Sequence, residues 1–255
     1  MRASGVLLDL DGTVYESGHA IRGAADALER LRAAGLSLRF VTNTTRLPRS
    51  ALAERLHGFG VRAEANELFT APLAAAAWLA EQGIQRVALF LPEPTWNEFA
   101  AFTITSERPD AVVVGDLGEA WTFERLNQAF RLVLEGAKLV ALQKNRFWKV
   151  DQELVLDAGP FVAAIEYAAG AQAQVIGKPS PEFFQAAARS MDLAPAGVVM
   201  VGDDIEADVR GAQQAGCRGA LVRTGKYRPG DEARTGRTPD AVLESVSDLP
   251  GWLLE

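Results

Sequence analysis

The residues of this chain that could perform chemistry are mostly acids, and they follow short apolar runs. Asp9 and Asp11 stand in the string DLDGT, directly after the apolar residues VLL. Asp203, Asp204 and Asp208 follow a second apolar run, GVVMV. In a parallel α/β sheet the ligands bind beyond the carboxyl ends of the strands. We therefore predict that these acids gather at one edge of one sheet.

Such a group of carboxylates favours a bound cation. Residues two apart on a strand point to the same face, so Asp9 and Asp11 are expected to approach one ligand together. Carboxylates held close together repel one another, and a hard divalent cation relieves that repulsion. Magnesium fits best, because it takes oxygen ligands and is usually held by a few carboxylates together with a substrate phosphate. Zinc is disfavoured, because the two histidines, His19 and His57, show no ligand spacing.

Polar donors follow two further apolar runs. Thr42 and Asn43 come after LSLRFV, and Lys178 comes just past the short run VI. Taken singly, each of these strings is typical of a loop or a helix cap. Their hydroxyl, amide and ammonium groups are also the donors that hold a phosphoryl group. Together with a carboxylate nucleophile and a cation, they indicate phosphoryl transfer through an aspartyl-phosphate.

The elements that must position these residues alternate between short apolar runs and helical patterns. This alternation predicts an α/β fold, with a Rossmann-like parallel-sheet core and an inserted α/β cap domain. The core is expected over residues 1–71 and 175–255, and the cap over residues 72–174. Strands are predicted at 6–10, 36–43, 86–91, 111–116, 138–143, 197–203 and 217–224. Helices are predicted at 23–34, 48–58, 96–102, 123–134 and 159–170, and from residues 72 and 181 onward.

One segment of the insert, residues 143–160 (QKNRFWKVDQELVLDAGP), has poor periodicity and mixes charged with aromatic residues. Its position between two site motifs predicts a lid that excludes water and supplies specificity. Arg146, Phe147 and Trp148 are the candidates for substrate contact. The alternative is that Phe147 and Trp148 belong to the core of the cap and that the charges form a solvated rim.

The composition excludes several classes of function. The 255 residues suit one large domain or two modest ones. Lys and Arg number 26 against 33 Asp and Glu, a net charge of −7 without a basic block, which disfavours nucleic-acid binding. The single cysteine excludes an intrachain disulfide, and no apolar run nears the roughly 18 residues of a membrane span. We expect a cytoplasmic protein with no nucleic-acid or membrane partner, and a homodimer is left open.

Taken in order, the four motifs DLDGT, TNTT, GKPSPEFF and GDDIEAD resemble those of the haloacid dehalogenase superfamily of phosphohydrolases. The resemblance covers nearly the whole chain. The insert between the second and third motifs resembles the larger α/β cap of subfamily IIA, the NagD type. The longer strings FVTNTT, GDDIEADVRGAQQAG and LVRTGKYRPGDE resemble one branch of that subfamily. This branch contains phospholysine phosphohistidine inorganic pyrophosphate phosphatase and haloacid dehalogenase-like hydrolase domain-containing protein 2.

The resemblance implies a role for the acid pair and for the first acid of the later cluster. Asp9 would be the nucleophile that attacks phosphorus. Asp11 would protonate the leaving group and then activate water, which requires a raised pKa such as crowding by Asp9 provides. Magnesium would be bound by Asp9, by the backbone carbonyl of Asp11 and by Asp203.

The resemblance also implies roles for the remaining motif residues. Thr42 and Asn43 would hold the transferring phosphoryl group. Lys178 would offset negative charge on that group and on the nucleophile. Asp204 and Asp208 would orient the metal-bound waters or the lysine without binding the metal themselves.

Three interpretations of function follow from the sequence. The leading one is a magnesium-dependent phosphohydrolase for a small phosphorylated compound of the phosphohistidine, phospholysine or pyrophosphate type. The alternative within the same chemistry is a phosphomonoester phosphatase for a nucleotide, a sugar phosphate or pyridoxal phosphate. A remote alternative is a non-enzymatic module like a receiver domain, which also combines an acidic pair, a phosphorylatable Asp, a Thr and a Lys.

Overall fold

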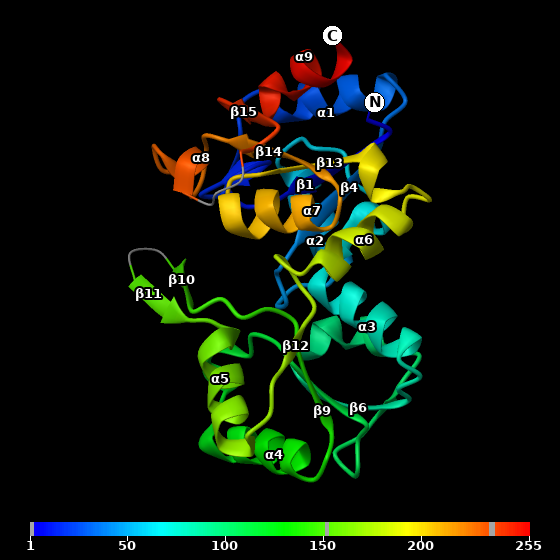
Figure 1. Ribbon diagram of the computed structural model, residues 1–255, viewed down its shortest axis with the longest axis vertical. Coiled ribbons are helices and arrows are strands. Elements are labelled where there is room, and N and C mark those ends of the chain that lie inside the picture. Colours follow the sequence, from blue (N-terminus) through cyan, green and yellow to red (C-terminus); the bar gives the residue numbers. More distant parts are fainter. Residues whose placement is uncertain (1–2, 151–152, 235–237) are drawn as a thin grey trace. The chain divides into compact units, whose positions relative to one another are not determined.

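The computed structural model describes residues 3–150, 153–234 and 238–255 (Figure 1). The chain divides into two compact units: Met1–Thr42, Arg49–Phe69 and Lys178–Glu255 form the first, and Asn43–Pro48 and Thr70–Gly177 form the second. Each unit contains a sheet with parallel strands and covering helices, which confirms the predicted fold class. The expected domain boundaries, at 71–72 and 174–175, lie close to the breaks between the units and stay predictions.

The first unit contains a six-stranded sheet in the order β15-β14-β13-β1-β4-β5, and the strands from β15 to β4 pair in parallel. The central strands β1 and β13 are buried along their whole length, because helices cover both faces of the sheet. This explains why both read as continuous apolar runs in the sequence. The strand bounds are β1 Gly5–Asp9, β4 Ser37–Thr42, β5 Leu68–Thr70, β13 Val198–Gly202, β14 Arg218–Val222 and β15 Ala241–Leu243.

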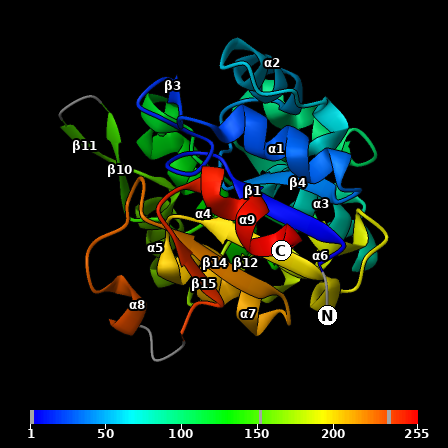
Figure 2. The ribbon, with the colours of Figure 1, turned by 90° about the horizontal axis from the view of Figure 1, so that it is seen from above.

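Helices α1 and α9 lie on one face of this sheet, and α6 and α7 lie on the other (Figures 1 and 2). In α1 the buried residues are Ala24, Ala27, Leu28 and Leu31, a spacing that makes one apolar stripe. The helices of this unit are α1 Ala24–Ala33, α2 Arg49–Gly58, α6 Pro181–Arg189, α7 Gly211–Gln214, α8 Asp231–Arg234 and α9 Leu249–Leu254. A small hairpin of β2 Tyr15–Glu16 and β3 His19–Ala20 follows β1, and a π-helix at Ile205–Arg210 precedes α7.

The second unit contains a five-stranded parallel sheet in the order β12-β9-β8-β6-β7. Its core includes an aromatic stack in which the Trp121 ring lies 5.9 Å from Phe90 and 4.9 Å from Phe161, centroid to centroid. The strands are β6 Arg86–Phe90, β7 Thr103–Ile104, β8 Ala111–Val114, β9 Lys138–Ala141 and β12 Gln174–Val175. The helices are α3 Ala71–Glu81, α4 Phe123–Leu134 and α5 Ala158–Ala169. Among the described helices of the chain, none is long and apolar enough to cross a membrane.

Two predicted elements differ in the structure. The helix expected at 96–102 is a 3₁₀ helix at Glu93–Phe99, because the proline pair of the string LPEP starts the turn earlier. The short run VI was expected to end a strand of the core. Its strand, β12, instead pairs with β9 of the five-stranded sheet in the second unit and forms an edge strand of that sheet.

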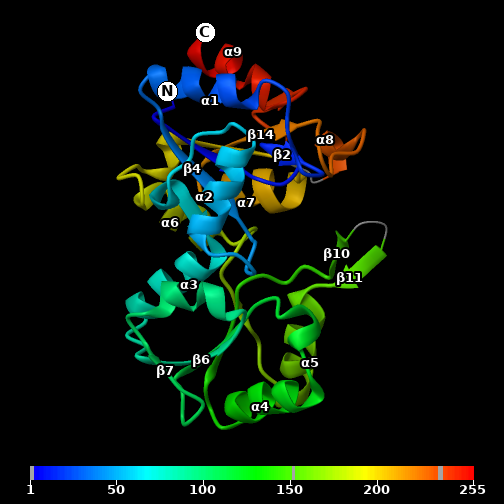
Figure 3. The same cartoon turned by 180° about the vertical axis from the view of Figure 1, so that it is seen from behind.

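The segment at 143–160 contains an antiparallel hairpin of β10 Phe147–Val150 and β11 Glu153–Leu156 (Figures 1 and 3). Its described apolar side chains are exposed on both faces, which explains why the sequence shows no alternation there. The root of the hairpin is fixed by a buried hydrogen bond from the Gln143 amide to Asp157. The two strands β10 and β11 therefore pair in a regular way, which the sequence pattern did not reveal.

The apolar packing of α6 is expected to stabilise the first unit. Substituting one buried and one exposed phenylalanine tests this contribution. Phe184 is fully buried and meets Phe183 edge to face at 5.6 Å, whereas Phe123 on α4 is 82% exposed. We predict that Phe184→Ala lowers the free energy of unfolding by about 3–5 kcal/mol, because it leaves a cavity. Phe123→Ala is the matched control and should change it by less than about 0.5 kcal/mol. Urea unfolding followed by circular dichroism measures both, and equal losses would contradict the prediction.

Candidate active site

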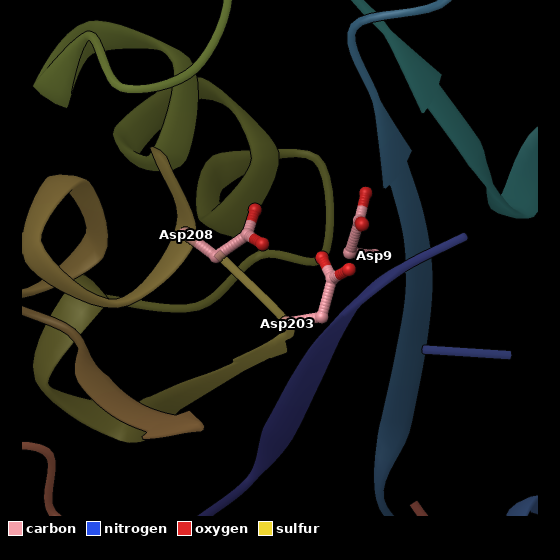
Figure 4. A group of neighbouring side chains, drawn as sticks. All are labelled: Asp9, Asp203 and Asp208. Atoms are coloured by element: carbon pink, nitrogen blue, oxygen red, sulfur yellow. The ribbon is translucent and has the colours of Figure 1, made fainter. Parts of the chain in front are cut away.

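Three carboxylates of the first unit converge at the end of its sheet (Figure 4). Asp9 ends β1, Asp203 follows β13, and Asp208 lies in the π-helix that comes next. Because β1 and β13 are paired neighbours, their carboxyl ends meet. One oxygen from each acid lies within 4.8 Å of the others, and the three residues are only 7%, 1% and 1% exposed. The two acidic strand ends thus meet as the sequence predicts.

Lys178 joins two of these acids. Its ammonium group donates hydrogen bonds to Asp9 Oδ1 at 2.5 Å and to Asp208 Oδ1 at 2.7 Å. The lysine reaches the site from the segment between β12 and α6 and is 5% exposed. Burial by itself would lower the pKa of Lys178, but the charges of Asp208 and Asp9 outweigh it and raise that pKa. Lys178 therefore stays positively charged between the two carboxylates.

Asp208 and Asp204 direct their oxygens toward donors of the chain itself. Asp208 Oδ1 accepts from Lys178, and its Oδ2 accepts from the backbone N–H of Asp204 at 3.2 Å. Asp204 Oδ1 accepts from the backbone N–H groups of Glu206 and Ala207 at 3.0 Å, so this side chain caps the start of the π-helix. These contacts suit residues that orient the site.

Asp203 differs, because only one of its oxygens has a donor. Its Oδ2 accepts from the backbone N–H of Lys226 at 2.6 Å. Its Oδ1 is buried and has no hydrogen-bond partner among the described residues. The backbones of Gly12 and Gly225 pass close to this carboxylate, and a Cβ on either glycine would lie 2.1 or 2.0 Å from Oδ2. This close approach of the backbone to the Asp203 carboxylate therefore requires glycine at positions 12 and 225.

The charges of this cluster fit a magnesium ion. Burial of Asp203, followed by the neighbouring charges of Asp9 and Asp208, raises the pKa of Asp203. Three buried carboxylates thus face one buried ammonium group, that of Lys178. A buried carboxylate oxygen without a protein donor is the kind of ligand that Mg²⁺ takes. The residues present therefore fit the ion that the sequence predicts.

Asp11 lies beside this group but outside it. Asp11 does not continue the strand, because β1 ends at Asp9, so the two acids do not share a strand face, and their approach to one ligand stays a prediction. The chain turns immediately afterwards, with the backbone N–H of Val14 donating to Leu10 O at 2.9 Å. The side chain of Asp11 is exposed at the surface. Partial burial of its carboxyl group and the charge of Asp9 still raise its pKa, as an acid–base residue requires.

Thr42 and Asn43 fall on either side of the break between the two units. Thr42 ends β4, which pairs with β1 so that Asp9 lies opposite Val41, and it is 5% exposed. The strand pairing therefore holds Thr42 at the same sheet edge as Asp9. Asn43 begins the segment at 43–48, which belongs to the second unit.

The segment at 43–48 is anchored firmly within the second unit. Arg46 donates two hydrogen bonds to the carboxylate of Asp116, at 2.6 and 3.0 Å. The backbone N–H of Asp116 in turn donates to Thr45 Oγ1 at 3.0 Å. The guanidinium of Arg46 also lies 4.8 Å from the ring centroid of Trp148. The chain that follows Asn43 is thereby tied to the hairpin.

The hairpin separates the three residues predicted to contact substrate. Phe147 pairs with Leu156 and Trp148 with Val155, so the two aromatic side chains point to opposite faces. Trp148 contacts Arg46, whereas Arg146 lies 5.8 Å from the ring centroid of Phe147. The rings are 49% (Phe147) and 37% (Trp148) exposed, which rules out the alternative that they belong to the cap core. Contact with substrate stays a prediction.

Sequence reasoning missed Lys226, which lies at the rim of the acidic cluster. Its backbone N–H holds Asp203, and its ammonium group lies 3.9 Å from Asp204 Oδ2. Burial lowers the pKa of Lys226, but the charges of Asp203 and the other cluster acids raise it overall. The sequence feature that could have identified Lys226 as a site residue is its position shortly after the strand at 218–222, in the string RTGKY.

Comparison with known proteins was made over the whole chain. A family described as haloacid dehalogenase-like hydrolase matches residues 6–105, and one described as HAD-hydrolase-like matches residues 175–249. Haloacid dehalogenase-like hydrolase domain-containing protein 2 of Mus musculus is 44% identical over 250 residues, 98% of this chain and 95% of that protein. Phospholysine phosphohistidine inorganic pyrophosphate phosphatase of Homo sapiens is 38% identical over 257 residues, 98% of this chain and 94% of that protein. These matches confirm the predicted resemblance.

Solved structures share the fold over nearly the whole chain. NagD from E. coli K-12 matches with a TM-score of 0.91 and 28% identity, over 97% of this chain and 98% of that one. Glycerol phosphate phosphatase from Mycobacterium tuberculosis, solved in complex with magnesium, matches with a TM-score of 0.89 and 30% identity, over 97% of this chain and 76% of that one.

The close approach at Gly225 gives a test of the predicted magnesium site. Gly225 and Gly170 both have a φ of +62°, but a Cβ at Gly225 would meet Asp203 Oδ2 whereas one at Gly170 would meet nothing within 4 Å. We predict that Gly225→Ala lowers the affinity for Mg²⁺ at least about tenfold, because Asp203 is displaced. Gly170→Ala has the same backbone strain and should leave the affinity unchanged. Titration calorimetry with MgCl₂ measures both, and equal affinities would refute the assignment of Asp203.

Proposed function

The chain belongs to the haloacid dehalogenase-like hydrolases and is a phosphatase, and from this premise we propose that it is Mg²⁺-dependent and works through an aspartyl-phosphate on Asp9. The observation that carries the proposal is the buried group of Asp9, Asp203 and Asp208 around Lys178. One oxygen of Asp203 in that group has no donor among the described residues. A site of this kind binds a cation and an anionic substrate together.

The first half of the reaction transfers the phosphoryl group to the protein. A carboxylate oxygen of Asp9 attacks phosphorus, and the bond between phosphorus and the leaving atom breaks. Asp11 gives its proton to the leaving atom, and its raised pKa favours the protonated form that this step needs. Asp9, Asp203 and the backbone carbonyl of Asp11 would hold Mg²⁺, which would supply positive charge to offset the charge of the phosphate.

The second half releases phosphate and restores the protein. Asp11, now ionised, takes a proton from water as the water attacks phosphorus, and the bond between Asp9 and phosphorus breaks. Thr42 and Asn43 donate hydrogen bonds to the phosphoryl oxygens. Lys178 offsets their charge and holds Asp9 in position. Asp204 and Asp208 orient the site, consistent with their contacts to backbone donors and to Lys178.

The proposed substrates are small phosphorylated compounds of the phosphohistidine, phospholysine or pyrophosphate type. The support is similarity over 98% of the chain to a phosphatase named for these three compounds. A phosphomonoester phosphatase remains the second candidate, because a glycerol phosphate phosphatase shares the fold at 30% identity. The receiver-like alternative is not retained, since the relatives matched over 98% of the chain are named as hydrolases or phosphatases. A cytoplasmic location and a homodimer stay predictions.

Two substitutions test the proposed mechanism. We predict that the wild-type protein releases phosphate from p-nitrophenyl phosphate with Mg²⁺ and loses this activity in EDTA. Asp9→Asn should lower turnover on the order of 10⁴-fold or more, because the nucleophile is absent. Asp11→Asn should accumulate a phosphoenzyme, because no base activates water. Acid-quenched labelling from a ³²P-labelled substrate measures the intermediate, and Asp26→Asn, an exposed acid of α1, is the control. Full activity in Asp9→Asn would refute the mechanism.

A third substitution tests the role of the hairpin. We predict that Trp148→Ala raises KM for the preferred substrate about three- to tenfold, because the half-exposed ring beside Arg46 is lost as a binding surface. The preferred substrate is identified by a phosphate-release screen of phosphoamidates, pyrophosphate, nucleotides and sugar phosphates. Leu154→Ala, on the other strand of the hairpin and 68% exposed, is the control and should leave KM unchanged. The same KM in both variants would argue against substrate contact by Trp148.

A further inference from the structure

Two cationic side chains of the first unit interact electrostatically with Asp11. They are Arg55, in the last turn of α2, and Lys226, in the loop after β14. Burial and the charge of Asp9 raise the pKa of Asp11, and the positive charges of Lys226 and Arg55 act on the same carboxyl group in the opposite direction. Under the proposed function Asp11 protonates the leaving group. A leaving group bound beside Asp11 therefore meets these two cations.

The position of Lys226 is fixed by its backbone. Its N–H donates to Asp203 Oδ2 at 2.6 Å, and the preceding residue, Gly225, lies against Gly12, where a Cβ on Gly225 would be 2.5 Å from the Gly12 Cα. The ammonium group lies at a looser distance, 3.9 Å from Asp204 Oδ2, and the side chain is 68% exposed. The lysine thus holds its place through the backbone while its charge faces solvent at the rim of the site.

The position of Arg55 is fixed by Tyr15. The Tyr15 ring lies 5.1 Å from that of Phe59, just beyond the end of α2, and the backbone of Tyr15 forms a bridge with Asp11. Tyr15 is 5% exposed, and its hydroxyl interacts with the guanidinium of Arg55. Arg55 itself is exposed and, among the described residues, forms no ion pair with a neighbouring acid. Its charge is therefore available to a ligand beside Asp11.

A structural role for Arg55 is the alternative. A basic residue in the last turn of a helix stabilises that helix through its dipole, and α2 also carries His57 there. Such a role would affect the stability of the protein and would act equally on all substrates. It does not explain why the arginine is directed to the tyrosine that adjoins Asp11. Kinetics with substrates of different charge separate the two roles.

We propose that Arg55 and Lys226 bind a negative charge on the leaving group, so that this phosphatase prefers substrates whose leaving group is itself an anion. A second phosphoryl group or a carboxylate next to the transferred phosphoryl group satisfies this chemistry. Guanidinium and ammonium groups bind both anions through charge-assisted hydrogen bonds. The proposal rests on the proposed function and assigns Arg55 and Lys226 to substrate specificity.

The test compares substrates that differ in the charge of the leaving group. Inorganic pyrophosphate and 2-phosphoglycolate provide a phosphate and a carboxylate, and 2-hydroxyethyl phosphate is the neutral reference. With saturating Mg²⁺, Arg55→Gln should lower kcat/KM for the two anionic substrates about tenfold more than for the reference, mainly through KM, since a charge-assisted hydrogen bond is lost. Arg55→Lys should recover most of the loss. Lys226→Gln should likewise lower kcat/KM more for the anionic substrates than for the reference. Arg30→Gln, which replaces an exposed arginine of α1, should leave kcat/KM unchanged for all three substrates.

The outcomes separate this inference from the proposed function. A larger loss on both anionic substrates supports the proposal, and a larger loss on one of them identifies which anion the pair recognises. An equal loss on all three substrates, or no loss, overturns it while leaving the phosphatase assignment intact. If the wild-type protein releases phosphate from none of the three but does so from p-nitrophenyl phosphate, the inference fails and the proposed function stands. If it releases phosphate from none of these four compounds, the proposed function fails instead. Melting temperatures of the variants show whether Arg55 acts on stability, and a lowered melting temperature with an unchanged substrate ratio also overturns the proposal.

Discussion

The structure of the first unit depends on an electrostatic constraint, the burial of three carboxylates beside one ammonium group. Asp9, Asp203 and Asp208 are almost inaccessible to water, and Lys178 compensates only two of them directly. Charges in such a place are unfavourable unless they are paired or bind a cation. The negative charge of Asp203 is not compensated by Lys178, so Asp203 is the group of the three that a bound cation would stabilise most. This imbalance favours a bound cation, which in turn would offset the charge of an anionic substrate.

The sheet order determines how these charges meet. β1 lies between β13 and β4, so the strand ends that carry Asp9, Asp203 and Thr42 are adjacent. The turn after β1 then passes so close to Asp203 that only glycine fits at position 12, with Gly225 facing it from the loop after β14. At this point the close approach of two backbones takes the place of side-chain packing. The geometry of the site is therefore a consequence of strand order and of two glycines.

Much of the fold could be predicted from the sequence, because its signals are local. The buried strands β1, β8 and β13 read as apolar runs, and helices such as α1 show an apolar stripe. The hairpin at 147–156 escaped prediction, because its exposed apolar residues do not alternate. The partner of β12 also escaped prediction, since two residues carry no information about which sheet edge they join. Such pairings depend on what lies nearby in space.

For the site, the sequence by itself determined which acids and donors stand at strand ends, and from them it predicts phosphoryl transfer around Asp9. It could do so because that chemistry needs particular residue types in short motifs. Only the tertiary structure decided that Asp11 lies outside the buried trio, that Asp208 holds Lys178, and that the charges of Arg55 and Lys226 act on Asp11. These relations join segments far apart in the chain. Charge interactions depend on distance and burial, which folding sets and which no local spacing encodes.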